Sequence, residues 1–198
     1  MTTQAIGASG ISDVTDGYNA LVFVIAQALK ALAGPTLVKV ISCTANGSVA
    51  GIGTVDVQPL VNQVTGGGDG VPHGPLHSLP YFRLQAGGNA VICDPEPGDV
   101  GVAVFASRDL SKVIATGAAA NPGSARYWDW ADGLYLGTVL AANAPTQYMQ
   151  FFGGAITLAA PAVNVQGNLN VSTGATGSFT TPTGQTVDVT NGIVTNIY

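Results

Sequence analysis

The chain has 198 residues, of which 9% are charged and 46% are hydrophobic, and its formal net charge is −5. A globular domain usually carries about 25% charged residues. The high hydrophobic content excludes a disordered acidic chain, and the few, scattered basic residues argue against a protein that binds nucleic acid.

The N-terminal part of the sequence predicts neither a signal peptide nor a membrane span. Residues 1–4 (MTTQ) lack the basic residues of a signal peptide. The apolar run at residues 20–33 contains Gln27 and Lys30 and ends at Gly34-Pro35, short of the roughly 20 residues that a bilayer requires. We therefore expect a protein that is made in the cytosol and is not integral to a membrane.

Residues 16–33 are predicted to form a helix after a loose polar arm. Asp13, Thr15 and Asp16 offer N-cap oxygens, and Gly34-Pro35 supplies a C-terminal stop. Apolar residues cover most of the helix circumference, so the helix must be buried on more than one side. We expect it to dock on other subunits or on a second protein through Leu21, Phe23, Ile25 and Leu29.

Residues 35–132 are predicted to form a small antiparallel β-barrel or sandwich, because short strand patterns follow one another without intervening helices. Asn46-Gly47 is a strong hairpin signal. Residues 65–80, which are rich in Gly and Pro, are expected to form a long loop. The predicted strands are residues 36–43, 49–57, 81–85, 90–93, 100–106 and 112–116.

Residues 133–198 contain no Lys, Arg, Glu or His, and Asp188 is their one acidic residue. Thr, Asn, Gln, Ser and Gly replace charge there, and short segments alternate apolar with polar residues. Each segment is too short to bury its apolar face alone, so we expect identical chains to wind together into one β-structure. The predicted trimer core comprises Ile156, Leu158, Val163, Val165, Leu169, Val171, Val187 and Val189.

The sequence offers almost no material for a catalytic or metal site, and we expect no enzyme activity, no cofactor and no metal. His73 and His77 are the two histidines, and Gly74-Pro75 excludes the helix on which their spacing could bind a metal. The carboxylates of the DPEPGD segment at residues 94–99 are expected to cap and solvate a turn.

Two further sets of side chains invite a functional interpretation. Cys43 and Cys93 have no metal-binding spacing, and we expect buried free thiols, with one disulfide as the alternative. The aromatic cluster is expected to pack at a domain or subunit junction; it comprises Tyr127, Trp128, Trp130 and Tyr135.

Several segments, in their order along the chain, resemble one known family. They are TVDVQPLVN at residues 54–62, PEPGDVGVAVF at residues 95–105, SRDL at residues 107–110 and RYWDWAD at residues 126–132. With the N-terminal helix and the ending VTNGIV at residues 189–194, they resemble the central membrane-piercing spike proteins of contractile-tailed bacteriophages. The resemblance covers most of residues 16–198.

The resemblance implies both a fold and a function. It implies an N-terminal arm and helix at residues 1–34, an OB-like β-barrel at residues 35–132, and an intertwined trimeric β-helix at residues 133–198. The RYWDWAD segment would lead out of the barrel. The protein would be a homotrimer at the virion tail tip, attached to hub or baseplate proteins, that perforates the host outer membrane when the tail contracts.

One family feature is missing from this sequence. Several such spikes carry a His-x-His pair near the apex, where three chains bind an iron ion, but no histidine follows His77 here. We therefore expect the apex to be held by apolar and Asn/Thr packing, or to be capped by a separate tip protein.

The alternative function is a receptor- or carbohydrate-binding tail fibre, with Trp128 and Trp130 as a sugar platform. A hydrolase is a third possibility, for which the sequence lacks a convincing carboxylate pair. The helix and barrel favour the spike, because fibres more often begin with attachment repeats and end in a binding head.

Overall fold

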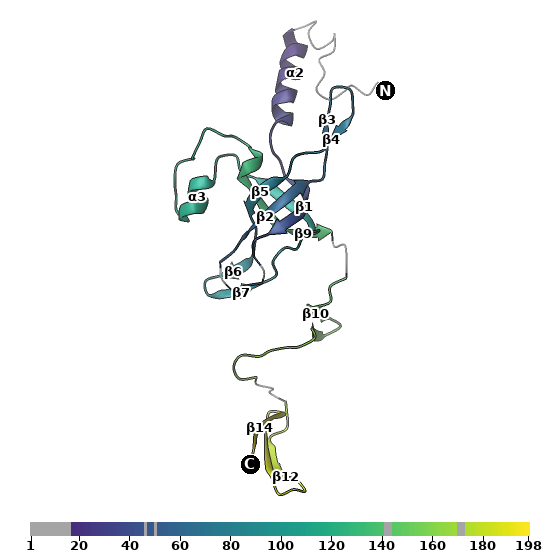
Figure 1. Cartoon of the computed structure of the whole chain (residues 1–198), viewed down its shortest axis with the longest axis vertical. Coiled ribbons are helices and arrows are strands. Elements are labelled where there is room, and N and C mark those ends of the chain that lie inside the picture. The colour runs from purple at the N-terminus through teal and green to yellow at the C-terminus, as the bar shows by residue number, and fades with distance from the viewer. Residues whose placement is uncertain (1–16, 46, 50, 141–143, 170–172) are drawn as a thin grey trace. The chain divides into compact units, whose positions relative to one another are not determined.

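The computed structural model describes residues 17–45, 47–49, 51–140, 144–169 and 173–198. The chain divides into two compact units, Met1–Ala144 and Pro145–Tyr198. It is mainly β, with an N-terminal helix and a curled antiparallel sheet (Figure 1). The predicted mainly-β class is confirmed.

The N-terminal helix predicted from the sequence is present as α2 (Gly17–Lys30). Its expected N-cap residues, Asp13, Thr15 and Asp16, lie outside the described residues. The helix is followed by Ala33, which is fully buried in the core of the first unit.

Five strands form one sheet in the order β5-β2-β1-β8-β9, with antiparallel neighbours throughout. Just beyond β5, Tyr81 forms a parallel bridge with Tyr135 in β9, and the Phe82 amide donates to the Tyr135 carbonyl (2.8 Å). These bonds join the two edges, so the sheet curls on itself. Its strands are β1 (Thr36–Cys43), β2 (Thr54–Pro59), β5 (Leu76–Pro80), β8 (Val100–Phe105) and β9 (Gly133–Leu140).

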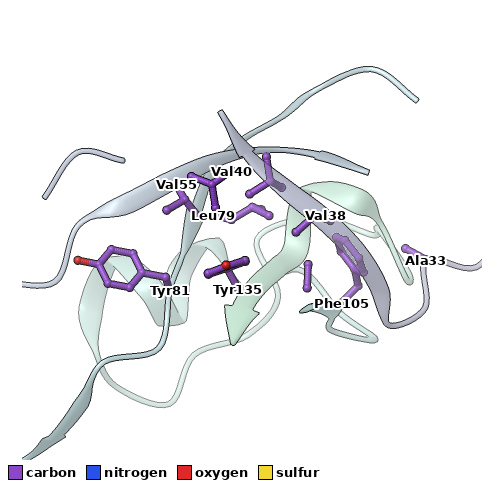
Figure 2. Packing of buried hydrophobic residues seen from close by; sticks show 10 residues of the cluster. Ala33, Val38, Val40, Val55, Leu79, Tyr81, Phe105 and Tyr135 are labelled. Carbon is purple, nitrogen blue, oxygen red and sulfur yellow. The ribbon is translucent and has the colours of Figure 1, made fainter. Parts of the chain in front are cut away.

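The core of the first unit lies inside this curled sheet (Figure 2). In β2 and β8 every second residue is buried, as expected for strands with one face on a core. A Cβ on Gly101 would collide with the Gly137 carbonyl and the Tyr135 hydroxyl, so glycine allows β8 and β9 to close around this tyrosine. The core residues are Ala33, Val38, Val40, Val55, Val57, Leu79, Tyr81, Ala103, Phe105 and Tyr135.

The strands predicted at residues 36–43 and 100–106 are confirmed as β1 and β8. The strand predicted at residues 49–57 is confirmed only from Thr54, where β2 begins. The predictions at residues 81–85 and 90–93 correspond to a separate hairpin, β6 (Leu84–Ala86) with β7 (Asn89–Val91).

The prediction of a strand at residues 112–116 is wrong, because this segment belongs to helix α3 (Ser111–Thr116). The Asp109 carboxylate accepts a bond from the Ser111 amide (2.8 Å) at the start of this helix. Gly117 ends the helix in the left-handed conformation (φ 63°), and its amide donates to the Val113 carbonyl (2.8 Å).

The prediction of one long loop at residues 65–80 is also wrong. The segment contains β4 (Gly70–Val71), which pairs with β3 (Gln63–Val64), and it contains all of β5. Gly and Pro dominate only as far as Pro75, and the LHSLP sequence that follows pairs with β2.

The barrel extends beyond the boundary predicted at residue 132. The short 3-10 helix η1 (Trp130–Asp132) leads directly into β9, which pairs with β8 as the fifth strand of the sheet. The RYWDWAD segment therefore leads into the sheet, not out of it. The uncharged sequence of β9 resembles the rest of the tail in composition, which is why the sequence placed it there.

The second unit contains two small sheets. β10 (Tyr148–Phe152) pairs with β11 (Ala155–Ala159), and a three-stranded sheet follows. It comprises β12 (Gly177–Thr180), β13 (Thr186–Thr190) and β14 (Ile193–Ile197). The alternating segments at residues 156–158 and 187–189 are strands, as expected, whereas residues 163–165 are not in a strand.

We expect truncation after Ala144 to leave a folded first unit and truncation after Asp132 to unfold it, because the shorter fragment lacks β9 and the buried Tyr135. Removing a large buried side chain alone typically costs about 3–5 kcal/mol. Circular dichroism melting of the two fragments tests this. A cooperative transition for both fragments would contradict the assignment of β9 to the core sheet.

Candidate assembly surface

The three-stranded sheet of the second unit has one apolar and one polar face. Its register places Phe179 opposite Val187 and Val187 opposite Ile197, with Val189 paired to Val194 on the same face. The opposite face carries Ser178, Thr180, Thr186, Asp188, Thr190, Ile193 and Asn196. The one charged side chain of residues 133–198 thus lies on the polar face.

Most of this apolar face is open to solvent in the single chain. Val187 is buried, at 6% exposure, because it lies in the central strand between two large neighbours. Phe179, Val194 and Ile197 are each more than half exposed. A three-stranded sheet needs a second layer over its apolar face, so this face requires cover.

The β10–β11 hairpin repeats the pattern on a smaller scale. Met149 pairs with Leu158 and Phe151 pairs with Ile156, which places four large apolar side chains on one face. All four are more than half exposed. A two-stranded hairpin of this kind is marginally stable in water by itself.

The predicted trimer-core residues fall into separate places. Val187 and Val189 lie on the apolar face of the three-stranded sheet, and Ile156 and Leu158 lie on the apolar face of the hairpin. Val165 and Leu169 border a groove with Thr190 and Ile193, on the other side of that sheet. Val163 is exposed in an irregular segment, and Val171 lies outside the described residues.

Sequence reasoning missed the large residues that complete these faces. They are Met149, Phe151, Phe179, Val194 and Ile197. Met149 and Phe151 flank Gln150 in the same apolar–polar–apolar order that identified Val187, so a sequence signal was available for these two residues.

The helix residues expected to dock on partners are on the surface of the single chain. Leu21, Ile25 and Leu29 are exposed, and Phe23 is half-buried. No residue of α2 is buried.

A buried ion pair fixes the base of the β6–β7 hairpin to the curled sheet. The Arg83 guanidinium and the Asp94 carboxylate are 2.6 Å apart, with side-chain exposures of 2% and 5%. The Tyr81 hydroxyl and the Gly47 amide also donate to this carboxylate, at 2.6 and 2.9 Å. Burial alone would raise the pKa of Asp94, but these donors outweigh burial and lower it.

A second ionic cluster anchors the long connecting segment between β8 and β9. The Arg126 guanidinium contacts Asp132 and Asp109, at 3.0 and 3.1 Å. Hydrogen bonds from Ser111 and Ser124 hold the pKa of the Asp109 carboxyl well below its usual range. Because every charge in the cluster has a partner inside the fold, the cluster is structural in character.

The aromatic residues separate into packed and exposed rings. Trp130 packs edge-on against Phe105, with ring centroids 4.8 Å apart, and lies 4.7 Å from the His73 ring. Trp128 and Tyr127 are exposed, and the Arg108 guanidinium lies 3.8 Å above the Tyr127 ring. A sugar platform made of Trp128 and Trp130 together is therefore disfavoured, because Trp130 already packs against Phe105 and His73 inside the fold.

The remaining candidate residues lie as follows. Cys43 is half-buried and Cys93 is exposed, and both are free, so the expectation of two buried thiols is wrong for Cys93. The imidazole of His77 lies 3.1 Å from the Asp56 carboxylate, away from His73. Asp99 accepts a bond from the Glu96 amide (2.9 Å), the capping role expected for this acidic turn.

Within the described residues, no helix is both long and apolar enough to cross a bilayer. The sequence matches no protein-family model and no curated protein.

We expect Asp94→Asn to lower the melting temperature of the chain at pH 7 by several degrees, because Arg83 would keep its buried charge without an ionised partner. The pKa of Asp94 is lower in the folded than in the unfolded state, so its stabilisation is complete above the unfolded value of about 3.9 and is lost as the pH falls further. Asp94→Asn should therefore weaken the acid sensitivity of the melting temperature.

The matched control is Glu96→Gln, which makes the same acid-to-amide change at an exposed position two residues away. It should leave the melting curve at pH 7 unchanged. Equal effects of the two substitutions would show that the ion pair does not stabilise the sheet.

Proposed function

We propose that the protein is a homotrimeric structural spike at the tip of a contractile phage tail, with a mechanical and non-enzymatic role. The observation that carries this proposal is the pair of one-sided apolar sheets in the second unit. Phe179, Ile197, Phe151 and Ile156 are solvent-exposed in one chain although each belongs to an apolar face.

Identical copies are a suitable cover for these faces. Three chains around an axis can turn their apolar faces inward and their polar faces outward, and winding them together removes the exposed edges. Asp188 would then point away from the axis. A charge on the inner face would be repeated three times at short range in a poorly hydrated interior.

The first unit supports the resemblance to tail spikes. The curled five-stranded sheet, closed by a parallel bridge beyond β5, has the size and closure of an OB-like barrel. The family-like segments at residues 54–62 and 95–105 contain β2 and β8. In this proposal the barrel joins the shaft at residues 145–198 to the rest of the tail.

The proposed setting has a partner at each end. Hub or baseplate proteins would hold the N-terminal part, and the shaft would contact the host outer membrane transiently during contraction. With no histidine after His77, the apex would rely on apolar and Asn/Thr packing or on a separate tip protein. No role in nucleic-acid binding is proposed.

The function is tested at two levels. Native mass spectrometry of the purified chain should give the mass of a trimer, and a monomer would overturn the proposal. Contractile tail particles purified from the bacterium that carries the gene should contain three copies per tail. A trimer that is absent from tails and binds glycans would favour the receptor-binding alternative.

We expect Phe179→Asp to abolish a heat- and detergent-resistant trimer and Thr180→Asp to retain it. Phe179 lies on the apolar face, whereas Thr180, its neighbour in β12, lies on the polar face opposite the uncharged Thr186. An unpaired buried charge and the lost packing together typically cost several kcal/mol per site. The measurement is SDS gel mobility without boiling, together with native mass.

Val187→Asp tests a second inward position, and Thr186→Asp, the neighbouring change on the polar face of β13, is its outward control. The inward substitution should be disruptive and the outward one tolerated. Equal tolerance of inward and outward carboxylates would show that the two faces of this sheet are not the inside and outside of a trimer.

A further inference from the structure

The helix α2 presents apolar side chains without a partner layer in the described chain. Leu21, Val24 and Leu29 are each more than half exposed, and no residue of the helix is buried. A 14-residue helix is marginal in water without tertiary contacts. The helix therefore needs a surface to pack against.

The spacing of its residues fits association with copies of itself. Tyr18, Leu21, Ile25, Ala28 and Leu32 follow the alternating three- and four-residue spacing of a coiled-coil seam. The turn after α2 extends this seam, since the Ala31 amide donates to the Gln27 carbonyl (3.1 Å) and the Leu32 amide to the Leu29 carbonyl (3.3 Å).

The polar residues lie away from the seam, on a face that they share with Phe23. Asn19, Gln27 and Lys30 are the polar side chains of the helix, and all three fall at heptad positions away from the seam. Val22 and Leu29 lie beside the seam and widen the apolar stripe. A wide stripe suits more than two helices, because a two-stranded coiled coil buries a narrower seam.

We propose that three copies of α2 pack in parallel around the three-fold axis of the trimer, with Leu21, Ile25 and Ala28 in the seam. This inference rests on the proposed trimer. Copies related by a three-fold axis point in the same direction. The Lys30 ammonium groups would face solvent, which avoids repeating a positive charge at the axis.

The connection to the sheet makes this association favourable. Ala33 is fully buried, and its amide donates to the Trp128 carbonyl (2.9 Å), so the chain just after the helix is fixed to the first unit. Two heptads associate weakly by themselves, but chains already held together by the shaft have a high effective concentration of helices.

Cysteine cross-linking of the full-length chain tests the seam. The background carries Cys43→Ala and Cys93→Ser, which removes the free thiols. Ile25→Cys places a thiol in the seam, and Gln27→Cys places one on the outer face two residues away. Oxidation with copper–phenanthroline should give at least several-fold more disulfide-linked dimer on a non-reducing gel for Ile25→Cys.

Equal cross-linking of the two variants, or preferential cross-linking of Gln27→Cys, would overturn the inference. Native mass separates the two proposals: a trimer without seam-specific cross-linking refutes only the helix bundle, and a monomer refutes both. Hydrogen exchange of the unmodified chain is independent of the cysteine background. Slow exchange of the α2 amides is expected without any other protein present, and complete exchange at the earliest time point would contradict the bundle.

Discussion

The constraint on which the structure depends is that a thin sheet cannot bury its own apolar face. The first unit meets this constraint within one chain, because five strands curl until the residue after β5 bridges to β9 and every strand contributes to one core. The described part of the second unit has a two-stranded and a three-stranded sheet. The large apolar side chains of these sheets are mostly exposed, so the physical requirement that shapes the curled sheet is also the basis for the proposed association of the second unit with other chains.

Charged residues are also distributed differently between the two units. The first unit uses ion pairs to fix segments that the sheet does not hold. Arg83 and Asp94 form a buried pair at the β6–β7 hairpin, and the partly exposed Arg126 pairs with the buried Asp109 in the segment that contains α3. Each carboxylate is surrounded by donors from its own chain. Residues 133–198 contain no basic side chain that could pair with a carboxylate. The polar face of their three-stranded sheet is formed by Ser, Thr and Asn around Asp188.

The sequence predicted the parts of the fold that depend on local pattern. β1, β2, β8 and α2 follow from runs of β-branched or apolar residues bounded by turn signals. Helix α3 was missed because Val113-Ile114 resembles a strand until Gly117 and Asp109 are seen as its end and its start.

Long-range features could not be predicted in the same way. The Gly47–Asp94 bond joins residues 47 positions apart, and no spacing in the sequence indicates it. The apolar faces of the tail depend on strand register, so Val187 was found from alternation while Phe179 and Ile197 needed the observed pairing. The assignment of β9 required its pairing with β8, since composition alone groups it with the tail.

Because charged residues are concentrated in the first unit, we expect the two units to respond differently to pH and salt. The pKa values of Asp94 and Asp109 are lowered in the fold, so we expect the first unit to lose stability at low pH, where protonation removes these ionic contacts. Asp188 is the one carboxylate side chain in residues 133–198 and lies on the polar face of its sheet. Association through the apolar faces of the tail would therefore depend little on pH or salt, because hydrophobic contacts carry no titrating group. The proposed shaft would then stay assembled under conditions that loosen the curled sheet of the first unit, which suits a structural part that must remain rigid outside the cell.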